Sequence, residues 1–213
     1  MSKTLEFSEL LVTKICHDLA APIGAIYNGV EFIESEGTYD IRGNRAYDLI
    51  ALNAEIASNK IKFFRYIYGK GDSNGEVDVR TLEALATDFF ANGKISIAFS
   101  NEKSGEHYVQ LTNSAGKLVL ILAYIASGCM IYGGKINIYL RHGRSGKTVI
   151  IEGVSEKNIK QDPEIESIIS KHEIRDIKLS NIVLHLASII ATEVAGKLYI
   201  TQRDISIKFE LEF

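Results

Sequence analysis

Apolar residues recur at helical spacing from Leu5 to about Glu34. A repeat of seven residues is typical of a helix that packs along a seam with other helices. We therefore predict one long bundle helix here, whose apolar positions are Val12, Leu19, Ile26 and Ile33, flanked by Ile15, Ile23 and Val30.

A second amphipathic stretch follows a short segment of turn-forming residues, 36–40. Its apolar residues run at helical spacing from Leu49 to about Tyr68, so we expect the first 70 residues to form a helical hairpin. Residues 69–75 are rich in glycine and other turn formers. They mark the predicted boundary between an N-terminal domain, 1–70, and a second domain, 76–213.

The hairpin is expected to need a partner. Two helices alone cannot bury an apolar seam, because bundles of this kind enclose their core with about four helices. A second copy of the chain would supply the missing pair. We therefore predict a homodimer through residues 5–68, in which each hairpin is half of a four-helix bundle.

From residue 76 the pattern changes to short apolar and alternating segments. Consecutive strands joined by short turns predict a mostly antiparallel sheet, and the apolar helices predict that one face of it is covered. The expected fold class is α+β, a helical hairpin followed by an α/β sandwich. The predicted helices are 79–90, 115–128, 163–171 and 180–194, and the predicted strands are 95–99, 108–111, 135–140, 148–152, 197–201 and 205–211.

The composition argues against several classes of partner and location. The 213 residues carry a net charge of −3, without the basic excess of a nucleic-acid-binding protein. Two cysteines cannot form a disulfide framework, so we expect a reducing, cytoplasmic environment. We expect no export signal, because Glu6 and Glu9 stand where one would be apolar. We also expect no membrane span at 118–134, because glycines interrupt that segment.

The candidate functional residue is His17, in the first predicted helix. With Val12 at heptad position a, His17 occupies position f, which points away from the seam and should be exposed. Small residues follow it on the same face and leave room for a docking protein. The expected contact floor is Ala20, Ala21 and Gly24, with Asn28 and the second helix near 53–60 at its edges.

Three residues near His17 are unfavourable inside a helix. Gly24 and Gly29 each cost roughly 1 kcal/mol relative to alanine. Pro22 has no N–H for the carbonyl of Asp18, so we expect the helix to bend and that carbonyl to bind water. Such a proline costs about 3 kcal/mol in an ordinary helix interior. A cluster of unfavourable residues points to a functional site.

An exposed imidazole is suited to nucleophilic chemistry. It is largely neutral at cytoplasmic pH, with one ring nitrogen free to attack. Asp18 either holds the other ring N–H and fixes the tautomer, or is simply a solvated carboxylate. Lys14, one turn before His17, is either a contact for an incoming phosphate or a solvated lysine.

A short stretch of the first helix resembles the H box of sensor histidine kinases, in their dimerisation and phosphotransfer domain. It is similar, more specifically, to the ChpT-type histidine phosphotransferases of bacteria. The matching residues are Cys16-His17-Asp18-Leu19, Pro22, Gly24-Ala25-Ile26 and Asn28-Gly29. One departure is Ala21, because many kinases carry there a threonine or asparagine linked to phosphatase action.

The resemblance also implies a second domain like that of a kinase, but residues for ATP are missing from the sequence. The helix predicted at 115–128 has no asparagine or carboxylate to hold Mg²⁺. Residues 152–156, Glu-Gly-Val-Ser-Glu, stand in place of the glycine-rich adenine turn, and 177–181 contain no glycine for a phosphate loop. We therefore expect a degenerate kinase-like domain that binds neither ATP nor a metal ion.

Together these features predict a dimeric histidine phosphotransferase of a phosphorelay. The resemblance implies that His17 accepts a phosphoryl group from a receiver-domain aspartate of a hybrid histidine kinase. It would then pass this group to receiver aspartates of response regulators, with Mg²⁺ held by the receiver. Two alternatives stay open: an ATP-dependent histidine kinase with a divergent nucleotide pocket, and a non-catalytic dimeric scaffold that binds kinases.

Overall fold

The computed structural model describes residues 3–36, 45–71, 75–104, 107–142, 146–169, 176–194 and 196–213. Parts of three predicted segments lie outside these ranges: 37–40 of the turn, 72–74 of the domain boundary and 170–171 of the helix 163–171. By their internal contacts, the residues form two compact units, 1–65 and 66–213.

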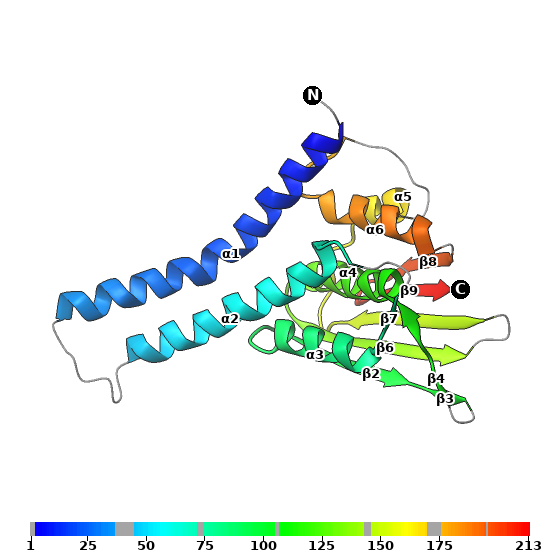
Figure 1. The fold of residues 1–213 in the computed structure, drawn as a ribbon, viewed down its shortest axis with the longest axis horizontal. Helices are drawn as coiled ribbons and strands as arrows, with labels where there is room; N and C mark the ends of the chain where they lie inside the picture. Colours follow the sequence, from blue (N-terminus) through cyan, green and yellow to red (C-terminus); the bar gives the residue numbers. More distant parts are fainter. Residues whose placement is uncertain are drawn as a thin grey trace. The chain divides into compact units, whose positions relative to one another are not determined.

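The first unit is the predicted helical hairpin. It consists of α1 (Lys3–Glu36) and most of α2 (Arg45–Tyr68), which lie side by side (Figure 1). Gly29 of α1 allows the two helices to approach closely, because a Cβ at this position would lie 2.7 Å from Cγ1 of Ile50. Helix α1 also changes direction along its length (Figure 1), as expected for a helix with Pro22 in its interior.

The second unit alternates short helices and strands. Its helices are α3 (Val79–Phe90), α4 (Asn113–Cys129), α5 (Pro163–Ile169) and α6 (Ile182–Val194). Its longer strands are β2 (Ile95–Asn101), β6 (Gly134–His142), β7 (Lys147–Val154), β8 (Lys197–Gln202) and β9 (Ser206–Glu212). Its short strands are β1 (Glu76–Val77), β3 (Lys103–Ser104), β4 (His107–Tyr108) and β5 (Leu111–Thr112).

The longer strands form a five-stranded sheet in the order β2-β6-β7-β9-β8. The pairs β6–β7, β7–β9 and β9–β8 are antiparallel, so the prediction of a mostly antiparallel sheet is confirmed. Strands β2 and β6 are parallel, because α4 lies between them in the sequence and provides the crossover that a parallel pair needs.

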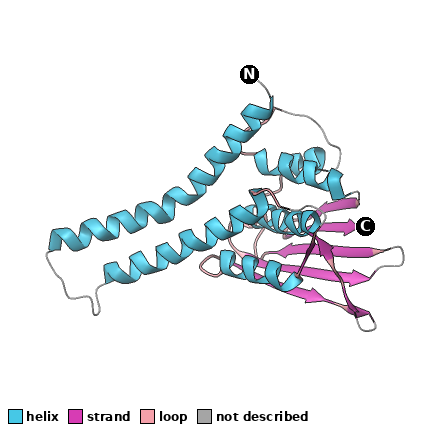
Figure 2. Ribbon diagram, in the orientation of Figure 1, coloured by secondary structure: helices cyan, strands magenta, loops and turns pink. Residues whose placement is uncertain are grey.

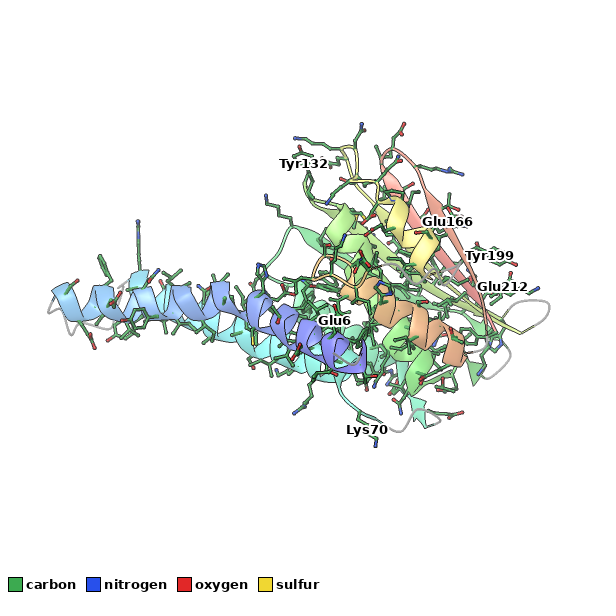
Figure 3. The ribbon with its side chains drawn as sticks, turned by 90° about the horizontal axis from the view of Figure 1, so that it is seen from above. Glu6, Lys70, Tyr132, Glu166, Tyr199 and Glu212 are labelled. Atoms are coloured by element: carbon green, nitrogen blue, oxygen red, sulfur yellow. The ribbon has the colours of Figure 1, made fainter. Side chains whose placement is uncertain are left out.

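Helices cover one face of this sheet (Figure 2). Alternate residues of β6 point toward them, and Ile136, Ile138 and Leu140 are fully buried. The opposite face is more exposed, and it carries Tyr199 of β8 and Glu212 of β9 (Figure 3). Helix α4 is a core helix, since residues 118–123 are all buried. The interpretation of 118–134 as a buried helix that ends in a turn is therefore confirmed.

The prediction of one strand over 108–111 is wrong. The segment is divided between β4, which pairs with β3, and β5, which pairs with β1, and neither belongs to the large sheet. The cause is the side chain of Asn101. Its amide oxygen accepts from the N–H of Val109 at 3.1 Å, and its amide nitrogen donates to the carbonyl of Val109 at 3.2 Å. Both main-chain groups of Val109 are thereby taken from any strand ladder.

The last turn of α2 belongs to the second unit. Ile67 is buried, and a Cβ on Gly116 of α4 would lie 2.9 Å from the hydroxyl of Tyr66. Lys117 of α4 donates to the carbonyl of Gly69. The division between the units therefore falls inside α2, a few residues before the turn-rich segment 69–75.

Candidate functional site

His17 is exposed on α1, as its heptad position predicted. The solvent reaches 73% of its side chain. Its Nδ1 lies 3.2 Å from Oδ1 of Asp18, the next residue along the helix. A carboxylate oxygen only accepts hydrogen bonds, so this contact is a hydrogen bond when the proton is on Nδ1. In that tautomer, Nε2 keeps its lone pair and is available as a nucleophile.

Asp18 is held more firmly than a solvated carboxylate. Its Oδ1 also accepts from the ammonium group of Lys14, one turn earlier, at 2.8 Å. Only 13% of the Asp18 side chain and 21% of the Lys14 side chain are exposed. Lys14 thus contacts the carboxylate that contacts the imidazole, and the three side chains form one connected group.

The carbonyl of Asp18 has a protein donor, and the expectation that it binds water is wrong. Pro22 provides no N–H, as the sequence indicated. In its place, Nζ of Lys60 on α2 donates to this carbonyl oxygen at 2.7 Å. Lys60 is half-buried, and it links the two helices next to His17.

The residues predicted to form a docking floor are exposed, and so is Asn28, which was predicted at its edge. Ala20, Ala21, Gly24 and Asn28 follow His17 along one side of α1, and we call these four residues the α1 stripe. Among the described residues, a Cβ on Gly24 would meet no atom of another segment within 4 Å, so no packing in this part of the chain requires glycine there. Gly29 is different, because its contact with Ile50 explains its lack of a side chain. The unfavourable glycines therefore have two separate causes.

In the second unit, Gly153 and Ser155 are buried, in the segment where the resemblance to kinases would place the adenine turn. A Cβ on Gly153 would lie 3.1 Å from Cε of Met130 and 3.2 Å from Cγ2 of Ile207. Ser155 is buried, and its N–H donates to the carbonyl of Ile205 at 2.9 Å. These contacts hold the main chain of this turn against the core.

The residues after this turn are also fixed. Asp162 and Gln202 exchange two hydrogen bonds, of 3.0 and 2.9 Å, and the N–H of Lys160 donates to the carbonyl of Cys129 at 2.8 Å. Burial raises the pKa of the Cys129 thiol to about 11, and the charge of Asp162 adds to this rise. Helix α5 then buries its isoleucines, which are Ile165, Ile168 and Ile169.

No metal site emerges from the part of the chain that the structure describes. Within it, no three His, Cys, Asp or Glu side chains are close enough together to share an ion. His17 and Asp18 have Lys14 as their charged neighbour, and a lysine ammonium is not a metal ligand at neutral pH.

Lys60 is the residue near His17 whose contact the sequence did not reveal. It lies 42 residues after Asp18, and the predicted edge at 53–60 included it only as part of a surface. The one available signal was Pro22. Its missing N–H indicates that the carbonyl four residues earlier needs another donor, but it does not indicate which residue provides that donor.

Comparisons with known proteins identify the family of the chain. A profile of the histidine phosphotransferase C-terminal domain matches residues 79–205. The chain is 31% identical over 137 residues to the protein phosphotransferase ChpT of Brucella abortus (strain 2308). This match covers 64% of the chain and 61% of that relative, so it spans about three fifths of the relative's length.

Solved structures share the fold. A bacterial phosphotransferase superimposes with a TM-score of 0.80 and 24% identity, covering 100% of this chain and 98% of that one. The histidine kinase AdeS of Acinetobacter baumannii superimposes with a TM-score of 0.50 and 12% identity, covering 92% and 96%. The family profile matches more than half of the residues of this chain. The chain therefore belongs to the histidine phosphotransferase family, as the H-box resemblance implied.

Proposed function

We propose that this protein is a phosphotransferase of a multistep phosphorelay, with His17 as the transient phosphoryl carrier. The observation that carries the proposal is the geometry of His17, whose ring is largely exposed while its Nδ1 is held by Asp18. Phosphoryl transfer depends mainly on in-line positioning and charge stabilisation, so an exposed and oriented imidazole is sufficient on this side. The donor is the receiver domain of a hybrid histidine kinase, and the recipients are receiver domains of response regulators.

The accepting step is a displacement at phosphorus. The Nε2 lone pair of His17 attacks the phosphorus of an aspartyl phosphate on the receiver. The N–P bond forms as the P–O bond to that aspartate breaks, and the aspartate leaves as a carboxylate with the electron pair. The proton on Nδ1 stays, and the carboxylate of Asp18 offsets the positive charge that develops on the ring. Transfer to the second receiver reverses these changes, and the receiver's acidic pocket supplies Mg²⁺.

The α1 stripe is the proposed contact floor for the receiver. Its residues are small or polar and exposed, so a receiver helix can approach the backbone of α1 beside His17. Gly24 is central to this surface, since glycine there lowers helix stability and no contact with the residues that the structure describes explains it. A docking partner gives the missing reason.

The hairpin is proposed to form a homodimer. Large apolar side chains of unit 1 are exposed at 41–61%, which is more apolar surface than two soluble helices usually leave open. They include Val12, Ile23, Tyr27, Val30, Leu49 and Leu52. A second hairpin that covers this surface completes a four-helix bundle, and light scattering that gave a monomer mass at every concentration would contradict it.

Helix α1 is proposed to lie in this bundle and not in a membrane. Within the described residues, Thr4–Ser35 is long and apolar enough to cross a bilayer by length and composition alone. However, Lys14 and His17 both contact Asp18 near its middle, and Lys60 of α2 reaches the same turn. Charged groups are costly at the centre of a bilayer. We therefore propose a protein of the cytoplasm, with neither membrane nor nucleic acid as a partner.

The second unit is proposed to bind no nucleotide. Support comes from the packed turn at Gly153 and from α4, which has no asparagine or carboxylate after its first residue, Asn113. Titration calorimetry with Mg²⁺ and ATP should give no binding heat. Heat that saturates at one nucleotide per chain would favour the alternative of an ATP-dependent kinase.

The proposed function is tested by phosphoryl transfer in solution. The full chain is mixed with a receiver domain labelled on its aspartate, and the label is followed on both proteins for the parent and for His17→Gln. We expect acid-labile label on the parent and none on His17→Gln. Labelling of the parent by ATP alone, or a variant that passes phosphate between receivers as well as the parent does, would contradict the proposal.

A further inference from the structure

We propose that Lys60 is a positioning residue for phosphoryl transfer, because its ammonium group holds the main chain at Asp18 and thereby the orientation of His17. The inference rests on the proposed role of His17. It assigns a task to a residue of α2, 42 positions after Asp18.

Pro22 deprives the carbonyl of Asp18 of its usual helical donor. In an α-helix the carbonyl of residue 18 would accept from the N–H of residue 22, and proline has none. Lys60 donates to this oxygen at 2.7 Å, so a charged donor from the neighbouring helix replaces the lost bond. Bonds from a charged donor are shorter and stronger than those between neutral groups. The turn of α1 next to His17 is therefore fixed from α2.

Asp18 transmits this restraint to the imidazole. Its carbonyl is held by Lys60, while its Oδ1 is held by Lys14 at 2.8 Å and contacts His17 Nδ1 at 3.2 Å. The carboxylate can hold the ring in one orientation only if the main chain that carries both side chains is itself fixed. Lys60 fixes that main chain at the point where the helix ladder is interrupted.

A direct contact between Lys60 and the phosphoryl group is the less favoured role. The ammonium group of Lys60 is bonded to a main-chain oxygen, and the residue is half-buried between the two helices. The ring of His17 is exposed for 73% of its area. Lys60 would have to leave the carbonyl of Asp18 to reach a phosphate on that ring.

The test compares Lys60→Met with Lys62→Met in the full chain. Lys62 lies on the same helix, and its ammonium contacts the side chain of Asn59 at 3.3 Å, so it controls for the loss of one positive charge. We expect Lys60→Met to lower the maximal rate of phosphoryl uptake from a labelled receiver about tenfold, the order expected for partial loss of alignment. The receiver concentration at half-maximal rate should not change, and Lys62→Met should match the parent.

A rescue experiment separates positioning from other effects of Lys60. Adding Pro22→Ala to Lys60→Met supplies an N–H in the helix for the carbonyl of Asp18, so uptake should recover by several-fold. Lys60→Arg keeps a charged donor and should retain most of the rate of uptake. This variant also keeps the inference testable if Lys60→Met folds poorly. The fraction of His17 with its proton on Nδ1, measured from ¹⁵N chemical shifts, should fall in Lys60→Met and return in the double variant.

The outcomes distinguish this inference from the proposed function. If the parent takes up no label, the role of His17 fails. If the parent is labelled and Lys60→Met is labelled at the same rate, only the role of Lys60 is overturned. Failure of Pro22→Ala to restore the rate would also overturn positioning through the carbonyl of Asp18.

Discussion

Oδ1 of Asp18 is shared between the imidazole of His17 at 3.2 Å and the ammonium group of Lys14 at 2.8 Å. One carboxylate oxygen therefore connects the proposed phosphoryl carrier to a cation one turn earlier. The lysine restrains the carboxylate, and the carboxylate restrains the ring.

Replacement of Asp18 by asparagine should slow phosphoryl uptake by His17 about tenfold or more, because a neutral amide stabilises the developing imidazolium less and no longer selects one tautomer. Lys14→Met is the matched change, since it leaves the contact between Asp18 and the ring in place and should slow uptake less. Rapid-quench measurements with a phosphorylated receiver give both rates. Equal rates for parent and Asp18→Asn would mean that Asp18 has no part in the chemistry.

The two glycines of α1 should respond in opposite ways to a methyl group. Gly24→Ala meets no atom within 4 Å and should raise the free energy of unfolding by up to about 1 kcal/mol. Gly29→Ala should lower it, since the new Cβ would lie 2.7 Å from Ile50. Urea denaturation measures both.

A larger residue at position 24 tests the docking floor. Gly24→Leu should fold normally but weaken receiver binding at least tenfold, because its side chain occupies the surface beside His17. Parent-like affinity in isothermal titration would place the receiver elsewhere on the hairpin.

A single charge on the exposed apolar surface should dissociate the proposed dimer. Ile23 on α1 is 52% exposed, and Ile189 on α6 is 49% exposed. Ile189 is therefore a control of similar exposure that lies in the second unit, outside the proposed interface. Ile23→Glu buries an unpaired carboxylate in the dimer and should convert it to monomers at micromolar concentration. Ile189→Glu should leave the mass unchanged. Sedimentation equilibrium distinguishes the outcomes, and a dimeric Ile23→Glu protein would argue against this interface.

The stability of the protein should fall in mild acid because of His185 on α6. This residue is 9% exposed, and its Nε2 is buried with no hydrogen-bond partner among the described residues. Burial lowers the pKa of His185, and the charge of Glu164 opposes this shift. The folded state then binds a proton less readily than the unfolded chain does. The contribution of neutral His185 to the stability of the folded state is fully present above about pH 6.5. It is lost as the pH falls toward the pKa of His185 in the folded state.

His185→Leu removes this titration and should make the urea midpoint less dependent on pH below about 6.5 than in the parent. His142, which is exposed on β6, offers the control variant His142→Leu, and it should keep the slope of the parent. If His185→Leu and the parent lose stability equally on acidification, the neutral buried state of His185 is not the cause.

The sequence pattern predicted what depends on local periodicity. The heptad that begins at Val12 placed His17 on the exposed face, and the uninterrupted apolar run at 118–123 identified a buried helix. Both features follow from which side of a helix contacts water or protein. The mostly antiparallel sheet followed in the same way from strands separated by short turns.

The features that escaped prediction are single contacts between polar side chains and the main chain of another segment. Asn101 bonds to both main-chain groups of Val109 and interrupts a strand, and Lys60 replaces the helical donor missing at Pro22. Periodicity reports average burial and carries no information about such pairs. Only at Pro22 did the sequence indicate a main-chain group that needed another partner, the carbonyl of Asp18, and the donor became known only from the fold.

The central claim is that Nε2 of His17 carries the phosphoryl group while Nδ1 stays protonated beside Asp18. The most direct measurement is ³¹P and ¹⁵N NMR of the ¹⁵N-labelled chain after transfer from a phosphorylated receiver. We predict one phosphohistidine, with a ³¹P–¹⁵N coupling to Nε2 of His17. Phosphorus bonded to Nδ1 of His17 or to another residue, or no phosphohistidine at all, would contradict the account.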